Sequence, residues 1–103
     1  MWLVVAFDIP VEPDENKKAY RSLRKLLISN GFTFFQKSLA WRWVQSGNGA
    51  DKIQKKLYAV SQNKNCSLLM FLIPDAAFQR TALIEDGRRG KVPLPPTPWN
   101  IIS

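Results

Sequence analysis

The stretch WLVVAFDIP, from Trp2 to Pro10, decides how the rest of the chain is interpreted. Its first six residues form an unbroken apolar run rich in β-branched and aromatic side chains, which is typical of a strand buried on both faces. Pro10 ends the run, because proline fixes the backbone angle φ and has no N–H to donate. The sequence therefore predicts a buried strand, with Asp8 at the point where the strand ends.

A helix is expected next, from a cap at Asp14 to about Asn30-Gly31, where glycine supplies the left-handed stop. Apolar side chains at the i, i+4, i+7 and i+8 spacing predict its buried face: Ala19, Leu23, Leu26 and Leu27. Cations gather on the opposite side with no acid between them: Lys17, Lys18, Arg21, Arg24 and Lys25. A solvated face usually mixes both signs, so this stripe indicates phosphate binding, with an ordinary solvated face as the alternative.

Downstream of this helix, the pattern predicts further strands and a second main helix. Residues 32–44 are either one long bent strand or two strands joined by a tight break. A loop at 46–49 leads into an amphipathic helix at 51–61, and residues 66–73 form another apolar strand. The remaining predictions are a short helix over 75–80 capped by Asp75, a brief strand at 82–84, a turn at 85–87, and no regular structure from 88 until 99–102.

This order of elements is the βαββαβ pattern of a ferredoxin-like α+β sandwich, with one antiparallel sheet and two helices on one face. We assign residues 1–87 to that domain and residues 88–103 to a basic, proline-rich C-terminal extension with a terminal strand. The last sheet strand is expected at or near an edge, yet residues 68–73 carry no protective charge. Residues 99–102 are expected to cover that edge, and the stiff proline linker favours exchange between chains, so we predict a homodimer with tail exchange.

The composition of the chain excludes several classes of protein and kinds of site. The chain has 103 residues and a net charge of +7, and its 46% hydrophobic content excludes a disordered basic tail. No histidine is present, which excludes Ser-His and Cys-His nucleophile pairs and histidine metal ligands. Cys66 alone makes neither an internal disulfide nor a structural zinc site. No apolar run approaches the ~20 residues needed to span a bilayer, so we expect a cytoplasmic protein with no membrane partner.

Asp8 is the best candidate for chemistry, because a carboxylate between a buried strand and a proline-fixed turn is held rigidly. A turn-capping aspartate is the alternative. One carboxylate is a poor Mg²⁺ site, but a twofold axis could bring two copies together at a dimer interface. Arg88 and Arg89 form a second basic cluster, suited to phosphate contact or to solubility alone. Trp41 and Trp43 share a strand face and are interpreted as core or dimer contacts rather than as base-stacking residues.

Four segments resemble the Cas-two (Cas2) family, the small universal CRISPR adaptation proteins: residues 4–10, residues 18–27, Gly31-Phe32 and Gln36-Lys37-Ser38. The resemblance extends through length, element order and the C-terminal extension. It implies a ferredoxin-like homodimer whose C-terminal strand packs on the partner and which lies between integrase dimers in the complex that inserts new spacers. It also implies a metal-dependent endonuclease acting on RNA or duplex DNA, with Asp8 as ligand of Mg²⁺ or Mn²⁺. Two departures concern the strand region, where Phe34 replaces an arginine of many members and Ala40-Trp41 replaces an aromatic-acidic pair.

Three functions are therefore open. The first is a DNA-binding scaffold for spacer acquisition whose cations hold the duplex backbone: Lys17, Arg21, Arg24, Lys25, Arg88 and Arg89. The second is a nuclease in which paired Asp8 carboxylates bind the metal. The third is a toxin-like metal-dependent endoribonuclease acting outside CRISPR, which the same fold and aspartate would permit.

Overall fold

A computed structural model describes residues 1–10, 14–62 and 66–96, with residues 14–16 as backbone only. Its elements follow one another as β1 (Trp2–Asp8), α1 (Asp14–Ser29), β2 (Thr33–Gln36), β3 (Leu39–Trp43), α2 (Gly47–Ser61), β4 (Ser67–Ile73), α3 (Asp75–Gln79), β5 (Leu83–Glu85) and β6 (Arg88–Gly90). The predicted cap at Asp14 depends on a side chain that is not described, and the predicted strand at residues 99–102 lies outside the described residues. The tail exchange therefore stays a prediction.

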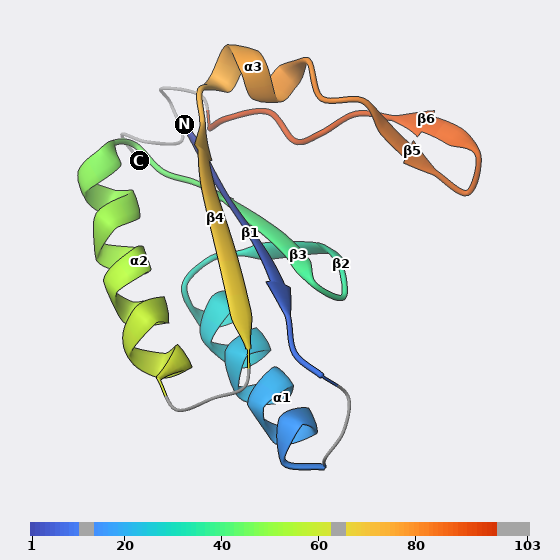
Figure 1. The fold of residues 1–103 in the computed structure, drawn as a ribbon. Coiled ribbons are helices and arrows are strands. Elements are labelled where there is room, and N and C mark those ends of the chain that lie inside the picture. The colour runs from blue at the N-terminus through green and yellow to red at the C-terminus, as the bar shows by residue number, and fades with distance from the viewer. Residues whose placement is uncertain (11–13, 63–65, 97–103) are drawn as a thin grey trace.

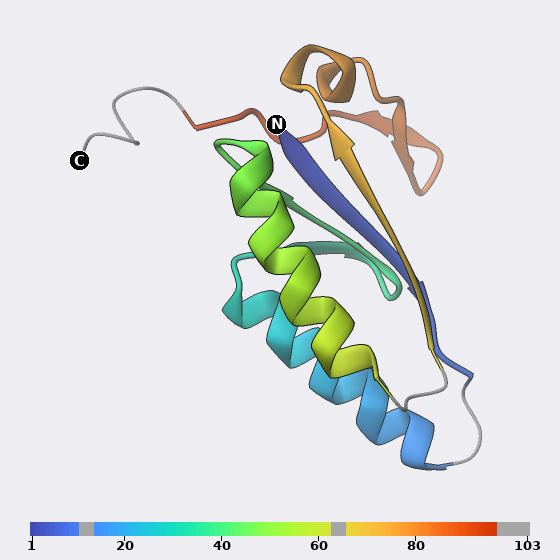
Figure 2. The same cartoon turned by 60° about the vertical axis from the view of Figure 1, so that its left-hand side comes forward.

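The strands β2, β3, β1 and β4 form one antiparallel sheet in that spatial order. Helices α1 and α2 lie side by side on one face of it (Figures 1 and 2). This arrangement confirms the predicted ferredoxin-like α+β sandwich. The apolar run that opens the chain occupies an inner position, since β1 bonds to β3 on one side and to β4 on the other. Strand β4 lies at the sheet edge, as expected.

Alternation along β1 divides the apolar side chains into two cores. Leu3, Val5 and Phe7 face the helices and pack in a cluster that includes Leu23 and Leu27 of α1. The intervening side chains face the opposite side of the sheet, which carries neither α1 nor α2. We call this side the helix-free face; its buried cluster consists of Trp2, Val4, Trp41, Phe78 and Val92. The segment that runs from α3 to Val92 thus covers one end of the helix-free face.

Gly31 behaves as predicted. It adopts φ +85°, and the N–H of Phe32 donates to the carbonyl of Leu27 at 3.0 Å, which closes the end of α1. The region from 32 to 44 is resolved as two strands, β2 and β3, with a bulge between Phe34 and Gln36. Helix α2 begins earlier than expected, because the predicted loop at 46–49 supplies its first turn.

The largest correction concerns residues 88–90, which were expected to be irregular. Asp86 and Gly87 have φ values of 52° and 74°, the geometry of a two-residue turn that joins two antiparallel strands. A Cβ at Gly90 would lie 2.6 Å from Cδ2 of Leu83, so the leucine side chain lies over this glycine in the β5–β6 pair. Residue 87, the assigned end of the first domain, lies in this turn. The domain boundary stays a prediction.

Candidate nucleic-acid interface

Helix α1 presents its cations to solvent because its apolar side chains are used in the core. Leu23 and Leu27 are buried under the sheet, whereas the side chains on the outer side are exposed. We call this outer side the α1 basic face, which consists of Lys17, Lys18, Arg21, Arg24 and Lys25. A shallow hollow of about 590 Å³ runs along it, lined by Lys18, Arg21, Ser22, Arg24, Lys25 and Ile28. Such a surface can contact successive phosphate groups without reading bases.

Arg24 contacts an aromatic ring although its side chain is exposed. Its guanidinium carbon lies 4.4 Å from the centroid of the Phe34 ring, within cation–π range. Phe34 in turn packs edge-on against Phe7, with 6.0 Å between ring centroids. Strand β2 therefore fixes one end of the α1 basic face through an aromatic contact that the helical periodicity alone did not indicate.

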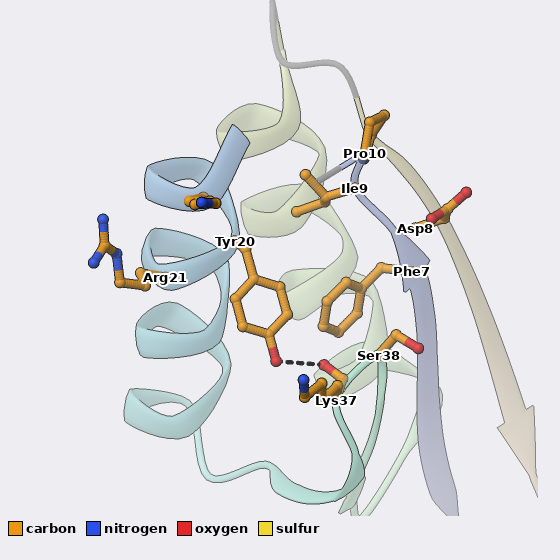
Figure 3. A pocket seen from close by; sticks show the side chains of 9 residues that line it. Phe7, Asp8, Ile9, Pro10, Tyr20, Arg21, Lys37 and Ser38 are labelled. Carbon is orange, nitrogen blue, oxygen red and sulfur yellow. Dashed lines mark hydrogen bonds between the residues drawn. The ribbon is translucent and has the colours of Figure 1, made fainter. Parts of the chain in front are cut away.

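A pocket that the sequence did not reveal lies between α1, the end of β1 and the turn from β2 to β3 (Figure 3). The Tyr20 hydroxyl donates to the Lys37 carbonyl at 2.7 Å, and the Phe7 N–H donates to the Ser38 carbonyl at 3.0 Å. These bonds hold the turn against β1 and α1. We call this cavity the Tyr20 pocket; it is lined by Phe7, Asp8, Ile9, Pro10, Lys17, Tyr20, Arg21, Lys37 and Ser38. The polar break Gln36-Lys37-Ser38 was its only sequence signal.

Asp8 is the last residue of β1 and pairs with Ser67 of β4. Its side chain is exposed and points away from Phe7 and Tyr20, across β1 (Figure 3). By strand alternation Asp8 belongs to the helix-free face, at the end opposite Trp2. Among the side chains that the structure describes, no three histidine, cysteine, aspartate or glutamate residues come together. Among the described side chains Asp8 is thus a single carboxylate, and a second copy of the chain is the way proposed to add another.

The two sets of candidate cations are not brought together within one chain. Arg88 and Arg89 lie on β6, in a hairpin that extends away from the sheet, whereas α1 lies towards the other end of the molecule (Figures 1 and 2). Glu85 lies opposite Arg88 in the hairpin. Both arginines line a hollow of about 520 Å³, and Glu85 and Asp86 line it as well. These acids offset the positive charge of the arginines, whereas, in the described part of the chain, no acid stands among the cations of the α1 basic face.

The tryptophans of β3 have structural roles. Trp41 is buried and stacks on Phe35, with 5.3 Å between ring centroids. The Trp43 indole N–H donates to the Asp75 carboxylate at 3.1 Å. Asp75 is the first residue of α3 and does not cap it, because the cap position belongs to Pro74. The interpretation of both tryptophans as packing residues is confirmed, and that of Asp75 as a helix cap is wrong.

Fold and surface charge together define a class of protein, the small basic proteins built on a ferredoxin-like sandwich. The chain belongs to the CRISPR-associated Cas2 family, since the family model described as "CRISPR associated protein Cas2" matches residues 1–81. No helix in the described part of the chain is long and apolar enough to cross a membrane.

Individual relatives agree with this assignment. The chain is 36% identical over 64 residues to the CRISPR-associated endoribonuclease Cas2 of Ligilactobacillus salivarius, an alignment that covers 62% of this chain and 63% of that one. It is 37% identical over 60 residues to the protein of the same name from Parvibaculum lavamentivorans, with 58% and 59% covered. The chain thus spans about three-fifths of the length of these curated relatives.

A solved structure supports the fold independently. The crystal structure of Streptococcus pyogenes Cas2 superposes with a TM-score of 0.65 at 22% identity, and the match covers 82% of this chain and all of that one. At that level of identity the likeness shows a shared fold.

Proposed function

We propose that the protein acts in CRISPR adaptation as a homodimeric scaffold that holds the backbone of duplex DNA and bridges subunits of the CRISPR integrase. The observation that carries this proposal is the α1 basic face, whose five cations are exposed along one side of a helix anchored in the core. Phosphate contacts of this kind position a duplex without specifying its sequence. Sequence-tolerant binding suits a protein that handles DNA fragments of varied origin.

The helix-free face supports the dimer. Leu69 and Phe71 of β4 are 59% and 39% exposed on that face, beside Ala6 and Val4 of β1. Strand β4 is also a sheet edge that carries no charged residue, the type of edge that pairs with another chain. Packing of two copies on this face would bury the exposed side chains, and a twofold axis near Asp8 would bring two carboxylates together.

Endonuclease activity is a second candidate. The curated relatives are named endoribonucleases, and Asp8 lies exposed at the end of β1. In this candidate the Asp8 residues of two chains would hold Mg²⁺ or Mn²⁺ between them, and the substrate would be RNA or DNA. Membership of a CRISPR-associated family favours a role in CRISPR over the toxin-like alternative.

Charge reversal on α1 tests the scaffold. We expect Arg21→Glu combined with Lys25→Glu to weaken duplex DNA binding by at least about tenfold at low salt, because phosphate contacts are replaced by repulsion. Both side chains are exposed and line the same hollow, and Arg24 is left in place because it packs on Phe34. Fluorescence anisotropy with a labelled blunt duplex measures the effect.

The matched control places the same charge change on α2. Lys52 and Lys55 are exposed on that helix, outside the α1 basic face. Lys52→Glu with Lys55→Glu should weaken binding only through the change in net charge, by much less than the α1 pair. Equal losses in both variants would mean that total charge, rather than the α1 surface, determines binding, and the proposal would be wrong.

Asp8→Asn separates the two candidate functions. The amide keeps the size of the side chain and removes the charge that a metal ion needs. We expect duplex affinity to change less than about twofold, since the Asp8 side chain points across β1, away from the α1 basic face (Figure 3). Any Mg²⁺-dependent cleavage of RNA or DNA should be lost. If the variant still cleaves, Asp8 is not the ligand of the metal ion.

A further inference from the structure

The Tyr20 pocket opens beside the surface proposed to hold the duplex backbone. Arg21 lines both the pocket and the hollow along α1, so the two are continuous at one residue. A duplex held on the α1 basic face would therefore lie next to a cavity of about 420 Å³. That volume falls within the range of pockets that take small organic groups.

We infer that the Tyr20 pocket receives one unpaired nucleotide of the nucleic acid bound on α1, with the base inside the pocket and its phosphate at the rim. This inference rests on the proposed function and specifies which part of the substrate the protein holds beyond the duplex. An unpaired base presents a flat apolar surface, while its phosphate carries a negative charge. The occupant must match both features of the cavity.

The walls of the pocket suit a base. Phe7, Ile9, Pro10 and Tyr20 supply apolar and aromatic surface, and Figure 3 shows the rings of Tyr20 and Phe7 side by side. Their centroids are 5.9 Å apart, so the two rings pack together as one wall. The hydrogen bond from the Tyr20 hydroxyl to the Lys37 carbonyl fixes the ring, which lowers the entropic cost of stacking a ligand on it.

The rim suits a phosphate. Three cations line the cavity, namely Lys17, Arg21 and Lys37, and Asp8, the one carboxylate among the described lining residues, points across β1 (Figure 3). Because the Tyr20 hydroxyl proton is already donated to a backbone carbonyl, this side chain offers its ring rather than a proton, and stacking on a ring does not distinguish bases. The pocket should accept an unpaired nucleotide of any sequence, in keeping with a backbone-binding scaffold.

The test compares two duplexes that differ only in the bases of a short single-stranded extension. One carries a thymidine extension, and the other carries an abasic extension with the same number of phosphates. We expect the protein to bind the thymidine form about five- to hundredfold more tightly, the range for stacking one base on aromatic side chains. Tyr20→Leu should abolish this preference, whereas Tyr20→Phe keeps the ring and should keep the preference. Lys18→Ala, outside the pocket, should weaken both duplexes equally.

A second measurement avoids reliance on variants that fold poorly. A fluorescent purine analogue in the extension should be quenched when the unmodified protein binds, because its base stacks on an aromatic ring. Equal affinity for the thymidine and abasic duplexes, or an unquenched analogue in the bound complex, would overturn the inference. In either case binding of the blunt duplex would show that the scaffold proposal still stands, while loss of blunt-duplex binding would count against the proposed function itself.

Discussion

Replacing both Leu69 and Phe71 by glutamate is expected to convert the proposed dimer into a monomer. Both side chains are large, apolar and exposed on the helix-free face, so a second copy packed there would bury them. Their combined burial contributes roughly 3 kcal/mol per subunit, so both subunits together contribute roughly 6 kcal/mol, which corresponds to about ten-thousandfold in the dimer dissociation constant. Two unpaired carboxylates from each subunit, four in the interface, would add a further penalty.

Analytical ultracentrifugation over a range of concentrations measures this change. Tyr58→Glu provides the control, because Tyr58 is 70% exposed but lies on α2, in the helical layer. The control should remain a dimer wherever the unmodified protein is one. A Leu69/Phe71 double variant that sediments as a dimer would show that the subunits meet elsewhere.

Phe78→Ala is expected to cause the largest loss of stability, about 3–5 kcal/mol in the free energy of unfolding. Phe78 is 2% exposed, stacks on Trp2 with 4.5 Å between centroids, and meets Trp41 edge-on at 5.5 Å. Its removal leaves a cavity between α3 and the sheet. Because Trp2 and Trp41 lie on inner strands, that cavity weakens the whole domain.

Urea unfolding followed by tryptophan fluorescence measures this loss. Arg80→Ala is the matched control, since Arg80 follows the same short helix and is exposed, so its effect should stay within about 0.5 kcal/mol. A loss below about 1 kcal/mol in Phe78→Ala would mean that α3 does not depend on its aromatic anchor.

The elements that could be predicted from sequence are those whose signals are local. The apolar run of β1 and the helical period of α1 each specify their own structure, and Gly31 marks the end of α1 through its backbone freedom. The exposure of the cations on α1 follows from the same period, because burial of Leu23 and Leu27 turns the opposite side outward. Those features needed no knowledge of the rest of the chain.

The features that escaped prediction depend on contacts between distant segments. The Tyr20 pocket forms only when α1, the end of β1 and the β2–β3 turn meet, through bonds from Tyr20 and Phe7 to a turn about 17 and 31 residues away. The β5–β6 hairpin was missed for a different reason. Its Asp86-Gly87 turn signal was recognised, but the short β6 strand carries no alternating apolar pattern.

The salt dependence of duplex affinity tests the central claim, that the α1 basic face holds the DNA backbone, most directly. For the unmodified protein we predict that the logarithm of affinity falls linearly with the logarithm of salt concentration, by about 0.9 per phosphate contact. The Arg21→Glu, Lys25→Glu variant should show a shallower slope, by about 0.9 for each contact it loses, while the Lys52→Glu, Lys55→Glu control keeps the original slope. An α1 variant whose slope equals that of the unmodified protein would contradict the claim, because its cations would then make no contact with phosphate.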